Sequence, residues 1–288
     1  MEKIYRDADV SMKPLDGKLV AVIGYGIQGK AQAANVRDSG VKVIIGTRPP
    51  EESTSRAQAK ADGFEACSIA EATKRADVLL IELADPAQPP IYKTDIAPNL
   101  SAGKTLCFCH GFNVLYGVIQ PPKDVNTVLF VPNAPGHLVR QKYLAGEGVY
   151  GCVAVDHDAT GNALAIALAV AKAVGSTRAG VVEMSFQHET EGDNFEEQIL
   201  YGGAIQLMRT CFRVMVDSHA SVDAFACEVL LADEMARCVG NKEYRVDVFG
   251  RLNDAVEDVE SVAEAECFSG REIGGDVGLV DRWLGRVG

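Results

Sequence analysis

The chain has 288 residues, of which 47% are hydrophobic, so it can bury a sizeable core in one large domain or two ordinary ones. Its 28 Lys and Arg against 40 Asp and Glu give a net charge of 28 − 40 = −12 without any concentrated basic run, which argues against nucleic acid and anionic membranes as partners. No apolar run approaches the roughly 18 residues of a membrane span, and the amino terminus has no hydrophobic leader-like segment, so we expect a cytoplasmic protein.

The first 184 residues alternate short apolar, β-rich runs with helical stretches, which is the pattern of a parallel sheet covered by helices. The expected strands are residues 19–24, 41–46, 77–83, 104–109, 127–132 and 151–155, several of them almost continuously apolar, as in strands buried on both faces. Helical stretches at 28–40, 55–63 and 68–76 lie between the earlier strands. The sequence therefore predicts an α/β fold whose doubly wound parallel sheet occupies residues 1–184.

The pattern changes after about residue 186. Ala, Leu, Met and Val recur there at spacings of three and four residues through 195–217, 221–239 and 252–265, which is typical of helices. No Pro- or Ser-rich linker precedes this region. We therefore expect an all-helical second domain over residues 185–288 that packs closely against the first.

The first expected strand runs into Gly24-Tyr25-Gly26-Ile27-Gln28-Gly29 and then into a helical stretch. Each glycine of this G-x-G-x-x-G spacing has a physical role in such a context. Gly24 permits a tight turn, Gly26 lets the backbone approach a pyrophosphate, and Gly29 allows close packing of helix on strand. The free N–H groups at the start of the helix attract the anion. Residues 24–29 are therefore predicted to bind a dinucleotide.

The second expected strand ends where the adenosine ribose of a dinucleotide would lie. The loop that follows carries one cation, three hydroxyls and two carboxylates, namely Arg48, Ser53, Thr54, Ser55, Glu51 and Glu52. The cation and the hydroxyls can bind a 2′-phosphate, whereas the carboxylates repel it and can accept a hydrogen bond from a free 2′-hydroxyl. We favour NAD(H) over NADP(H), with an ordinary solvated loop as the alternative for all but one or two of these side chains.

Three further blocks follow the glycine motif in order. They are His110-Gly111-Phe112-Asn113, Pro132-Asn133-Ala134-Pro135-Gly136-His137-Leu138-Val139-Arg140 and Asp193-Asn194-Phe195-Glu196-Glu197-Gln198. In their order and spacing these blocks resemble a short-chain (class I) ketol-acid reductoisomerase over residues 3–230. Several independent motifs match the same family, which argues against a chance resemblance.

The resemblance implies a Rossmann domain followed by a knotted, helical carboxyl-terminal domain. It implies an active site completed by a helix from a second subunit, and hence a homodimer or a dimer-based oligomer with shared sites. It also implies two chemical steps on a small hydroxy or keto acid. A Mg²⁺-assisted alkyl migration rearranges a 2-hydroxy-2-acyl acid, and a nicotinamide hydride then reduces the resulting ketone.

Two carboxylates fit the implied metal chemistry. Asp193 and Glu197 are four residues apart and would project from one face of a helix, where two like charges destabilise the isolated helix by a few tenths of a kcal/mol. A bound cation would reverse that effect, and hard Mg²⁺ prefers carboxylates, waters and substrate oxygens. Taken alone, such a pair is more often a solvated helix face. Within the family pattern we predict a metal role for both.

His110 follows an expected strand at the edge of the sheet where ligands bind in doubly wound folds. We predict that it orients the nicotinamide or a metal-bound water, with an ordinary core histidine as the alternative. Asp85, Gln88 and Gly136 complete the set of residues expected at the dinucleotide. For His137 the structural interpretation, in which it only holds the Pro-Gly turn, is preferred.

The sequence departs from the family pattern at three places. The family has a lysine after the proline of its Pro-Lys-Gly-Pro-Gly-His motif, and Asn133 occupies that position, so no ammonium group is available to stabilise a developing alkoxide. On the second helix, Glu228 matches the first of two metal-binding glutamates but Ala232 replaces the second. The family's Ser-Ile-Ser-Asn-Thr segment, which holds the substrate carboxylate, is replaced over residues 245–253 by a stretch with two arginines and an aspartate.

The candidate catalytic residues are thus His110, Asn133, Asp193, Glu197 and Glu228, and the candidate Mg²⁺ ligands are Asp193, Glu197 and Glu228. Three functions are consistent with them. The first is a reductoisomerase-like oxidoreductase recruited to specialised metabolism, for example to close a cyclopropanol ring on a sulfonium-bearing diol acid. The second is a genuine ketol-acid reductoisomerase of branched-chain amino-acid biosynthesis. The third is a non-catalytic dinucleotide-binding protein.

Overall fold

The computed structural model describes residues 3–49, 54–203, 206, 207 and 210. The strands are β1 (Lys3–Tyr5), β2 (Leu19–Ile23), β3 (Lys42–Thr47), β4 (Glu65–Ser68), β5 (Val78–Ile81), β6 (Thr105–Phe108), β7 (Asn126–Pro132), β8 (Gly151–His157) and β9 (Val181–Glu183). The α-helices are α1 (Ile27–Asp38), α2 (Ser55–Ala61), α3 (Ile69–Arg75), α4 (Gln88–Ile91), α5 (Phe112–Leu115), α6 (Gly136–Leu144), α7 (Ala163–Val174) and α8 (Phe186–Asn194). The 3₁₀ turn η3 (Asp85–Ala87) and the π-helices η4 (Tyr92–Ile96) and η7 (Phe195–Tyr201) also bear on the site or its surroundings.

The strands form one sheet in the order β1-β9-β8-β7-β6-β5-β2-β3-β4. From β7 to β4 every neighbouring pair is parallel, which confirms the predicted Rossmann-like core. The pairs β7–β8 and β1–β9 are antiparallel, so the expectation of a wholly parallel sheet is wrong there. An apolar run indicates that a strand is buried on both faces, but it does not indicate the direction of that strand in the sheet. The sequence also did not predict β1, β4 and β9, because these short strands contain no long apolar run.

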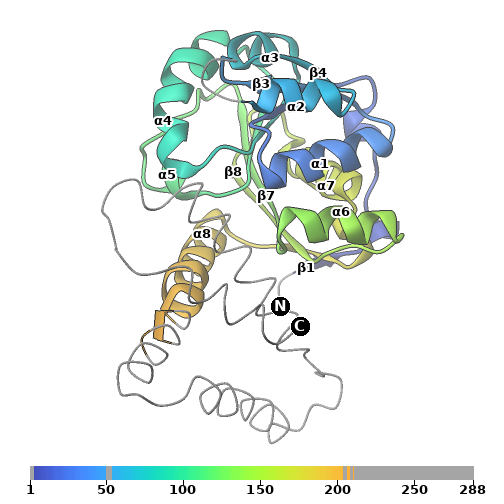
Figure 1. Cartoon of the computed structure of the whole chain (residues 1–288), viewed down its shortest axis with the longest axis vertical. Coiled ribbons are helices and arrows are strands. Elements are labelled where there is room, and N and C mark those ends of the chain that lie inside the picture. Colours follow the sequence, from blue (N-terminus) through green and yellow to red (C-terminus); the bar gives the residue numbers. More distant parts are fainter. Residues whose placement is uncertain (1–2, 50–53, 204–205, 208–209, 211–288) are drawn as a thin grey trace, which may run out of the picture. The chain divides into compact units, whose positions relative to one another are not determined.

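Alternate residues of each strand enter different core layers. On β5, Val78 and Leu80 pack in the layer under α1, α6 and α7, whereas Leu79 and Ile81 pack in the layer under α3. Helix α8 packs through Phe186 on the sheet face opposite α7. Figure 1 shows α1, α6 and α7 on one side of the sheet and α4 and α5 on the other. Helices thus cover both faces, and the strand ends are left to form sites.

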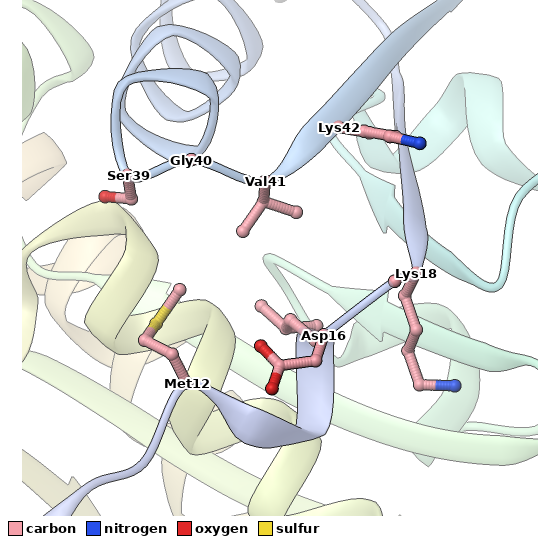
Figure 2. A pocket seen from close by; sticks show the side chains of 9 residues that line it. Met12, Asp16, Lys18, Ser39, Gly40, Val41 and Lys42 are labelled. Carbon is pink, nitrogen blue, oxygen red and sulfur yellow. The ribbon is translucent and has the colours of Figure 1, made fainter.

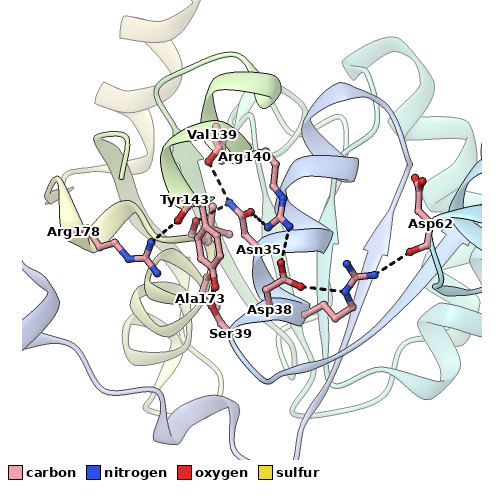
Figure 3. A network of polar contacts seen from close by, with 11 residues as sticks. Asn35, Asp38, Ser39, Asp62, Val139, Arg140, Tyr143, Ala173 and Arg178 are labelled. Carbon is pink, nitrogen blue, oxygen red and sulfur yellow. Dashed lines mark hydrogen bonds and ion pairs between the residues drawn. The ribbon is translucent and has the colours of Figure 1, made fainter. Parts of the chain in front are cut away.

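A buried amide holds α1 against α6 and α7 (Figure 3). The Nδ2 of Asn35 donates to the carbonyl oxygens of Val139 at 3.3 Å and Val174 at 2.9 Å. Its Oδ1 accepts from Nη1 of Arg140 at 2.8 Å, and Nη2 of Arg140 pairs with Asp38 at 2.6 Å. This network fixes the position of the helix that begins at the glycine motif.

A small cavity of about 170 Å³ lies at the amino ends of β2 and β3, between residues 12–18 and 39–42. Its lining includes Lys18 and Lys42, but Figure 2 shows both side chains directed away from the hollow. The glycine motif follows the carboxyl end of β2. The cavity is therefore at the opposite edge of the sheet from the residues predicted to bind ligands.

The chain divides into two compact units, Met1–Gly203 and Ala204–Gly288. The predicted helices 221–239 and 252–265 lie outside the described residues, so the knotted domain and the boundary between residues 184 and 185 stay predictions. The structure describes the first part of the helix predicted over residues 195–217. There, Phe195–Tyr201 is a π-helix rather than an α-helix. Apolar spacing does not distinguish the two, because they differ by one residue in the hydrogen-bonded turn. None of the helices in the described part of the chain has the length and apolarity needed to cross a membrane.

Candidate active site

The glycine loop, residues 24–29, joins β2 to α1 at the point where the strand order reverses between β2 and β5. Gly24 has φ +102°, and a Cβ there would lie 2.5 Å from the carbonyl oxygen of Glu82. A Cβ on Gly29 would lie 2.4 Å from the carbonyl oxygen of Gly24. At Gly26, by contrast, a Cβ would meet no protein atom within 4 Å. The fold itself thus requires the outer two glycines, while the middle one leaves open space beside the start of α1.

The other loop residues differ in what their side chains do. Tyr25 is buried, and its hydroxyl donates to Asp62 at 3.0 Å, so the ring contributes to packing. Gln28 donates through Nε2 to the carbonyl of Ala134 at 2.8 Å and ties the loop to the segment after β7. Ile27 is 53% exposed at the start of α1. The side chains of Tyr25 and Gln28 are thus engaged within the protein, and the predicted contacts of Tyr25, Ile27 and Gln28 with a dinucleotide stay predictions.

Gly136 lies at the start of α6, where a Cβ would be 2.3 Å from the carbonyl oxygen of Ile27. The glycine lets α6 approach the first turn of α1. The structure shows this packing contact, and the predicted contribution of Gly136 to dinucleotide binding stays a prediction. His137, in the same turn, is exposed.

The segment predicted to hold the adenosine ribose is described only in part. Arg48 is exposed and Ser55 begins α2, while Glu51, Glu52 and Ser53 lie outside the described residues. Arg56, which the sequence interpretation passed over, donates through Nε to the Thr47 hydroxyl at 2.9 Å and through Nη2 to the carbonyls of Thr47 and Cys67. It fixes the end of β3 where this segment leaves the sheet.

Asp85, His110 and Asp193, here called the His110 triad, come together at the same edge of the sheet. Asp85 follows β5 and His110 follows β6, and these strands are parallel neighbours with Ile81 opposite Phe108. The Nδ1 of His110 pairs with Oδ2 of Asp85, and its Nε2 lies 3.4 Å from Oδ2 of Asp193. Nε2 is buried and has no hydrogen-bond partner among the described residues. The imidazole therefore lies between two carboxylates with one nitrogen still able to take a partner.

Two amides hold Asp85 in place. Gln88 is 2% exposed, and its Nε2 donates to Oδ1 of Asp85 at 3.0 Å and to the carbonyl of Leu83 at 2.8 Å. Asn113 donates to the carbonyl of Asp85 at 2.9 Å and to Oε1 of Gln88 at 3.1 Å. The buried side chain of Gln88 thus positions Asp85. The sequence pattern predicted no role for Asn113, since only the folded structure brings it to Asp85.

Gly111 allows α8 to deliver Asp193. A Cβ on Gly111 would lie 2.0 Å from Oγ1 of Thr190 and 2.7 Å from the ring of Phe186, so α8 packs directly on this backbone. Ser185 caps α8, its hydroxyl accepting from the N–H of His188 at 3.0 Å. One turn after this contact, Asp193 reaches His110.

The charges in the triad act on one another. Burial lowers the pKa of His110, but the hydrogen bond and charge of Asp85, with the charges of Asp193 and Glu189, outweigh it, so that the pKa is raised. Burial raises the pKa of Asp193, the charge of His110 lowers it, and those of Glu196 and Asp85 raise it further. The site favours a protonated imidazole and offers a carboxyl that a cation would stabilise.

The structure describes the predicted metal ligands only in part. Asp193 has a 28% exposed side chain beside His110, and Glu197 lies one helical turn further on, in η7. The side chain of Glu197 and all of Glu228 are outside what the structure describes. Within the described residues, no three His, Cys, Asp or Glu side chains are grouped to hold a metal ion. Asp193 is the one predicted ligand whose surroundings are defined.

Asn133 follows β7 and is exposed. Its N–H donates to the carbonyl of Tyr150 at 2.9 Å, and its Nδ2 lies 3.8 Å from Sγ of Cys152. The side chain brings a neutral amide, and no positive charge, to this strand end. Asn133 therefore differs from the lysine of the family pattern in carrying no charge.

Comparison with known proteins agrees with the site. A family model, "Acetohydroxy acid isomeroreductase, NADPH-binding domain", matches residues 14–180. "Ketol-acid reductoisomerase (NADP(+))" of Pyrobaculum neutrophilum is 45% identical over 254 residues, which cover 88% of this chain and 76% of that protein. The protein of the same name from Caldivirga maquilingensis is 45% identical over 258 residues, which cover 89% and 77%.

Solved structures give the same result. An NADH-preferring ketol-acid reductoisomerase from an uncultured archean has a TM-score of 0.74 and 36% identity, covering 99% of this chain and 91% of that one. A semialdehyde dehydrogenase NAD-binding protein from Cupriavidus necator, at 18% identity and a TM-score of 0.61 over 86% of this chain and 99% of that one, shares the fold alone.

The glycine loop at the strand-order reversal and the charged triad beside it define a nicotinamide-dependent oxidoreductase with a Rossmann-like domain. Within that class, the chain belongs to the ketol-acid reductoisomerase family. The resemblance inferred from the sequence motifs and the expected type of enzyme are thereby confirmed.

Proposed function

We propose that the chain transfers hydride between a nicotinamide dinucleotide and a small hydroxy or keto acid chelated by Mg²⁺, with chemistry altered at the substrate end. The observation that carries this proposal is the His110 triad, a half-buried imidazole between two carboxylates at the edge of the sheet that bears the glycine loop. Perturbed titratable groups of this kind are typical of reaction sites. A non-catalytic dinucleotide-binding protein would give no reason for them.

The glycine loop fits a dinucleotide. The space at Gly26 and the first turn of α1, which has no side-chain cap, would receive the pyrophosphate. Arg48 and Ser55, with Glu51 and Ser53 on the same segment, would contact the adenosine ribose. We favour NAD(H), because the carboxylate would accept from a free 2′-hydroxyl. The NADH-preferring archaeal relative supports this preference, while the relatives from Pyrobaculum and Caldivirga are named for NADP(+).

When bound, the nicotinamide supplies a ring that gives or takes a hydride, and the divalent cation supplies a Lewis acid for a carbonyl oxygen. The protein's own residues handle the proton. Asp85 holds Nδ1 of His110, which leaves Nε2 as the atom that can hold or release a proton toward a substrate oxygen. Gln88 and Asn113 keep Asp85 in place during this exchange.

Asp193, Glu197 and Glu228 would hold the cation. Asp193 offers the hard carboxylate oxygen that Mg²⁺ prefers, and it lies 3.4 Å from Nε2 of His110. Burial raises the pKa of Asp193, a condition that a bound cation would relieve. Since η7 follows α8 directly, Glu197 is about one turn from Asp193 along the helix.

The departures from the family pattern affect residues that the family uses for alkyl migration and for binding the substrate. Asn133 contributes no charge at the end of β7, Ala232 replaces a metal ligand, and residues 245–253 lack the serine-rich segment. We therefore propose an enzyme recruited to specialised metabolism, for which cyclopropanol formation from a sulfonium diol acid is one example.

A genuine ketol-acid reductoisomerase, which converts 2-acetolactate to 2,3-dihydroxyisovalerate, is the second candidate. It is favoured by the 45% identity to the Pyrobaculum protein across 88% of the chain. It requires that Asn133 and Glu228 suffice where the family has a lysine and a pair of glutamates.

We also propose a homodimer, or an oligomer built from dimers, whose active sites are shared between subunits. Phe195, Ile199 and Leu200 of η7 are 55% to 62% exposed, close in sequence to Asp193. Apolar side chains grouped in this way are commonly covered by another protein surface.

The test is incubation of the purified protein with Mg²⁺, 2-acetolactate and either NADH or NADPH, following the absorbance of the reduced dinucleotide. Turnover at rates ordinary for the family would establish the second candidate and overturn the recruitment proposal. Asp193→Ala should abolish metal-dependent activity on the true substrate. Glu191→Ala is the matched control, because Glu191 lies on the same helix, is exposed and accepts from Gln187. Activity that survived Asp193→Ala would contradict the metal assignment.

A further inference from the structure

A glutamate lies directly under the glycine loop. Val78 and Leu80 of β5 face the core layer beneath α1, and Glu82 continues that alternation on the same side. Its N–H donates to the carbonyl of Ile23 at 2.8 Å, so the β5–β2 pairing extends as far as this residue. The carboxyl group of Glu82 is thereby directed toward α1.

The nearest side chains around this carboxyl group are neutral. Gln32 of α1, which is fully buried, and Cys109, which follows β6, both hydrogen-bond to it. The Nε2 of Gln32 also lies 3.8 Å from Sγ of Cys109, and its Oε1 has no partner among the described residues. Glu82 thus sits in a small polar cluster shared by α1, β5 and β6.

The charged and titratable groups facing Glu82 are few. Cys107 and Cys109 from β6 feel its charge, and Glu189 from α8 acts in turn on Cys109. From α1 the facing group is the uncharged Gln32. Of the lysines, arginines and histidines in the described part of the chain, none is among the groups that shift the pKa of Glu82. No cation of that part offsets its charge.

Glu82 is also in direct contact with the loop. A Cβ on Gly29 would lie 3.3 Å from Cβ of Glu82, and a Cβ on Gly24 would lie 2.5 Å from its carbonyl oxygen. These two glycines flank Gly26, where the open space for a pyrophosphate lies. Glu82 therefore packs directly against the loop that is proposed to receive the pyrophosphate.

Burial raises the pKa of Glu82 to about 7, and the hydrogen bonds from Cys109 and Gln32 lower it only in part. The residue is intermediate in exposure, and its carboxyl group is held by Gln32 and Cys109. The charge of Glu82 therefore changes near neutral pH.

We propose that Glu82 determines dinucleotide affinity, because its protonated form accepts a pyrophosphate on the loop above it and its ionised form opposes one. The inference rests on the dinucleotide site of the proposed function. Two negative charges at close range in a partly dry site repel each other. Binding the anion must then favour the protonated carboxyl, so a proton is taken up when the dinucleotide binds near neutral pH. Affinity is highest at acid pH and falls as Glu82 ionises.

The experiment measures NADH binding to the full chain by fluorescence titration from about pH 6 to about pH 8.5, with calorimetry near pH 7 in two buffers of different ionisation enthalpy. NADH is chosen because the 2′-phosphate of NADPH would itself titrate at about pH 6. If binding raises the pKa of Glu82 by about one unit, Kd rises about tenfold over the range. The calorimetry should show proton uptake.

The Glu82→Gln variant should bind NADH with little dependence on pH, and at high pH it should bind about tenfold more tightly than the wild type. Glu65→Gln is the matched control. It removes an equal charge from β4, where the carboxylate pairs with Arg75, and it should keep the wild-type pH profile.

Binding without proton uptake, or uptake that persists in Glu82→Gln, would overturn the role of Glu82 and leave the dinucleotide site intact. Absence of NADH binding at every pH would overturn the proposed site and this inference with it. Should Glu82→Gln fail to fold, as judged by circular dichroism, the uptake is measured in His110→Gln. Retained uptake there supports Glu82, and lost uptake assigns the proton to His110 and contradicts the inference.

Discussion

The glycine loop and the His110 triad lie at the same edge of one sheet but are built in opposite ways. The loop depends on backbone contacts, since a Cβ on Gly24 or Gly29 would come within 2.5 Å of a carbonyl oxygen. The triad consists of side chains delivered by η3, by the segment that follows β6 and by α8. The loop is encoded in six consecutive residues, whereas the triad exists only when distant elements pack.

This difference predicts how each region responds to substitution. The fold of the loop should be sensitive to added volume, because the contacts that shape it are with backbone atoms. The triad should be sensitive to changes in charge and hydrogen bonding even where the side-chain volume is conserved.

His110→Gln should give the largest effect. It keeps much of the side-chain volume but removes the group that exchanges a proton, and general acid–base catalysis typically contributes about 10²- to 10⁴-fold. We expect kcat for the nicotinamide-dependent reaction, measured by absorbance with the substrate found to be turned over, to fall within that range. Asp85→Asn should cause a smaller loss, because an amide can still bond to Nδ1 of His110. An unchanged kcat in His110→Gln would make the triad structural only.

The loop is tested by a pair of glycine substitutions. Gly29→Ala should lower the free energy of unfolding by about 2 to 3 kcal/mol, because the new methyl group would lie 2.4 Å from the carbonyl oxygen of Gly24. Gly26→Ala should leave stability within about 0.5 kcal/mol. It should instead weaken dinucleotide binding, because its methyl group would occupy the space left for the pyrophosphate. Urea unfolding and NADH titration measure the two quantities, and equal losses of stability would refute the distinction.

The contrast also explains what the sequence could and could not predict. The loop was predicted residue by residue, since strand, glycines and helix are contiguous. His110 and Asp193 were predicted from separate motifs, but their contact depends on α8 packing against Gly111, which no local pattern encodes. Gln88 was expected at the cofactor and is buried against Asp85, and Glu82 was passed over as a member of an apolar strand. Strand direction at β7–β8 was missed for the same reason, since pairing is a tertiary property.

The Asn35–Arg140 network joins α1, the helix that begins in the glycine loop, to α6. Breaking this network tests whether the position of α1 depends on charges distant from the loop. Arg140→Ala removes hydrogen bonds to Asn35 and Asp38 and should cost about 1 to 2 kcal/mol of unfolding free energy at neutral pH. Lys142→Ala is the control on the same helix. Its exposed pair with Glu147 should contribute less than about 1 kcal/mol.

The effect of Arg140→Ala should also depend on pH. Burial raises the pKa of Asp38, but its bonds to Arg140 and Arg37 outweigh burial, so the pKa is lowered in the folded protein. A lowered carboxyl pKa stabilises the fold above the unfolded-state pKa, and that contribution disappears as the pH falls through the folded-state pKa. The stability difference between wild type and Arg140→Ala should therefore shrink below about pH 4. A difference that stayed constant with pH would assign the effect to Asn35 alone.

The smallest effect is expected at Gly192, one of two glycines that adjoin the triad, with Gly111 beside His110 and Gly192 beside Asp193. Gly192 lies within α8, and a Cβ there would meet nothing within 4 Å, so Gly192→Ala should stabilise the protein by about 0.5 to 1 kcal/mol through the better helix propensity of alanine. Gly111→Ala should destabilise it, because the methyl group would displace Thr190 and Phe186 and move α8 away from His110. Thermal unfolding would measure both. Changes of opposite sign in stability would show that the close approach of α8 to the backbone, rather than glycine as such, sets the geometry of the triad. Destabilisation by both substitutions would mean that the surface of α8 at Gly192 is also packed.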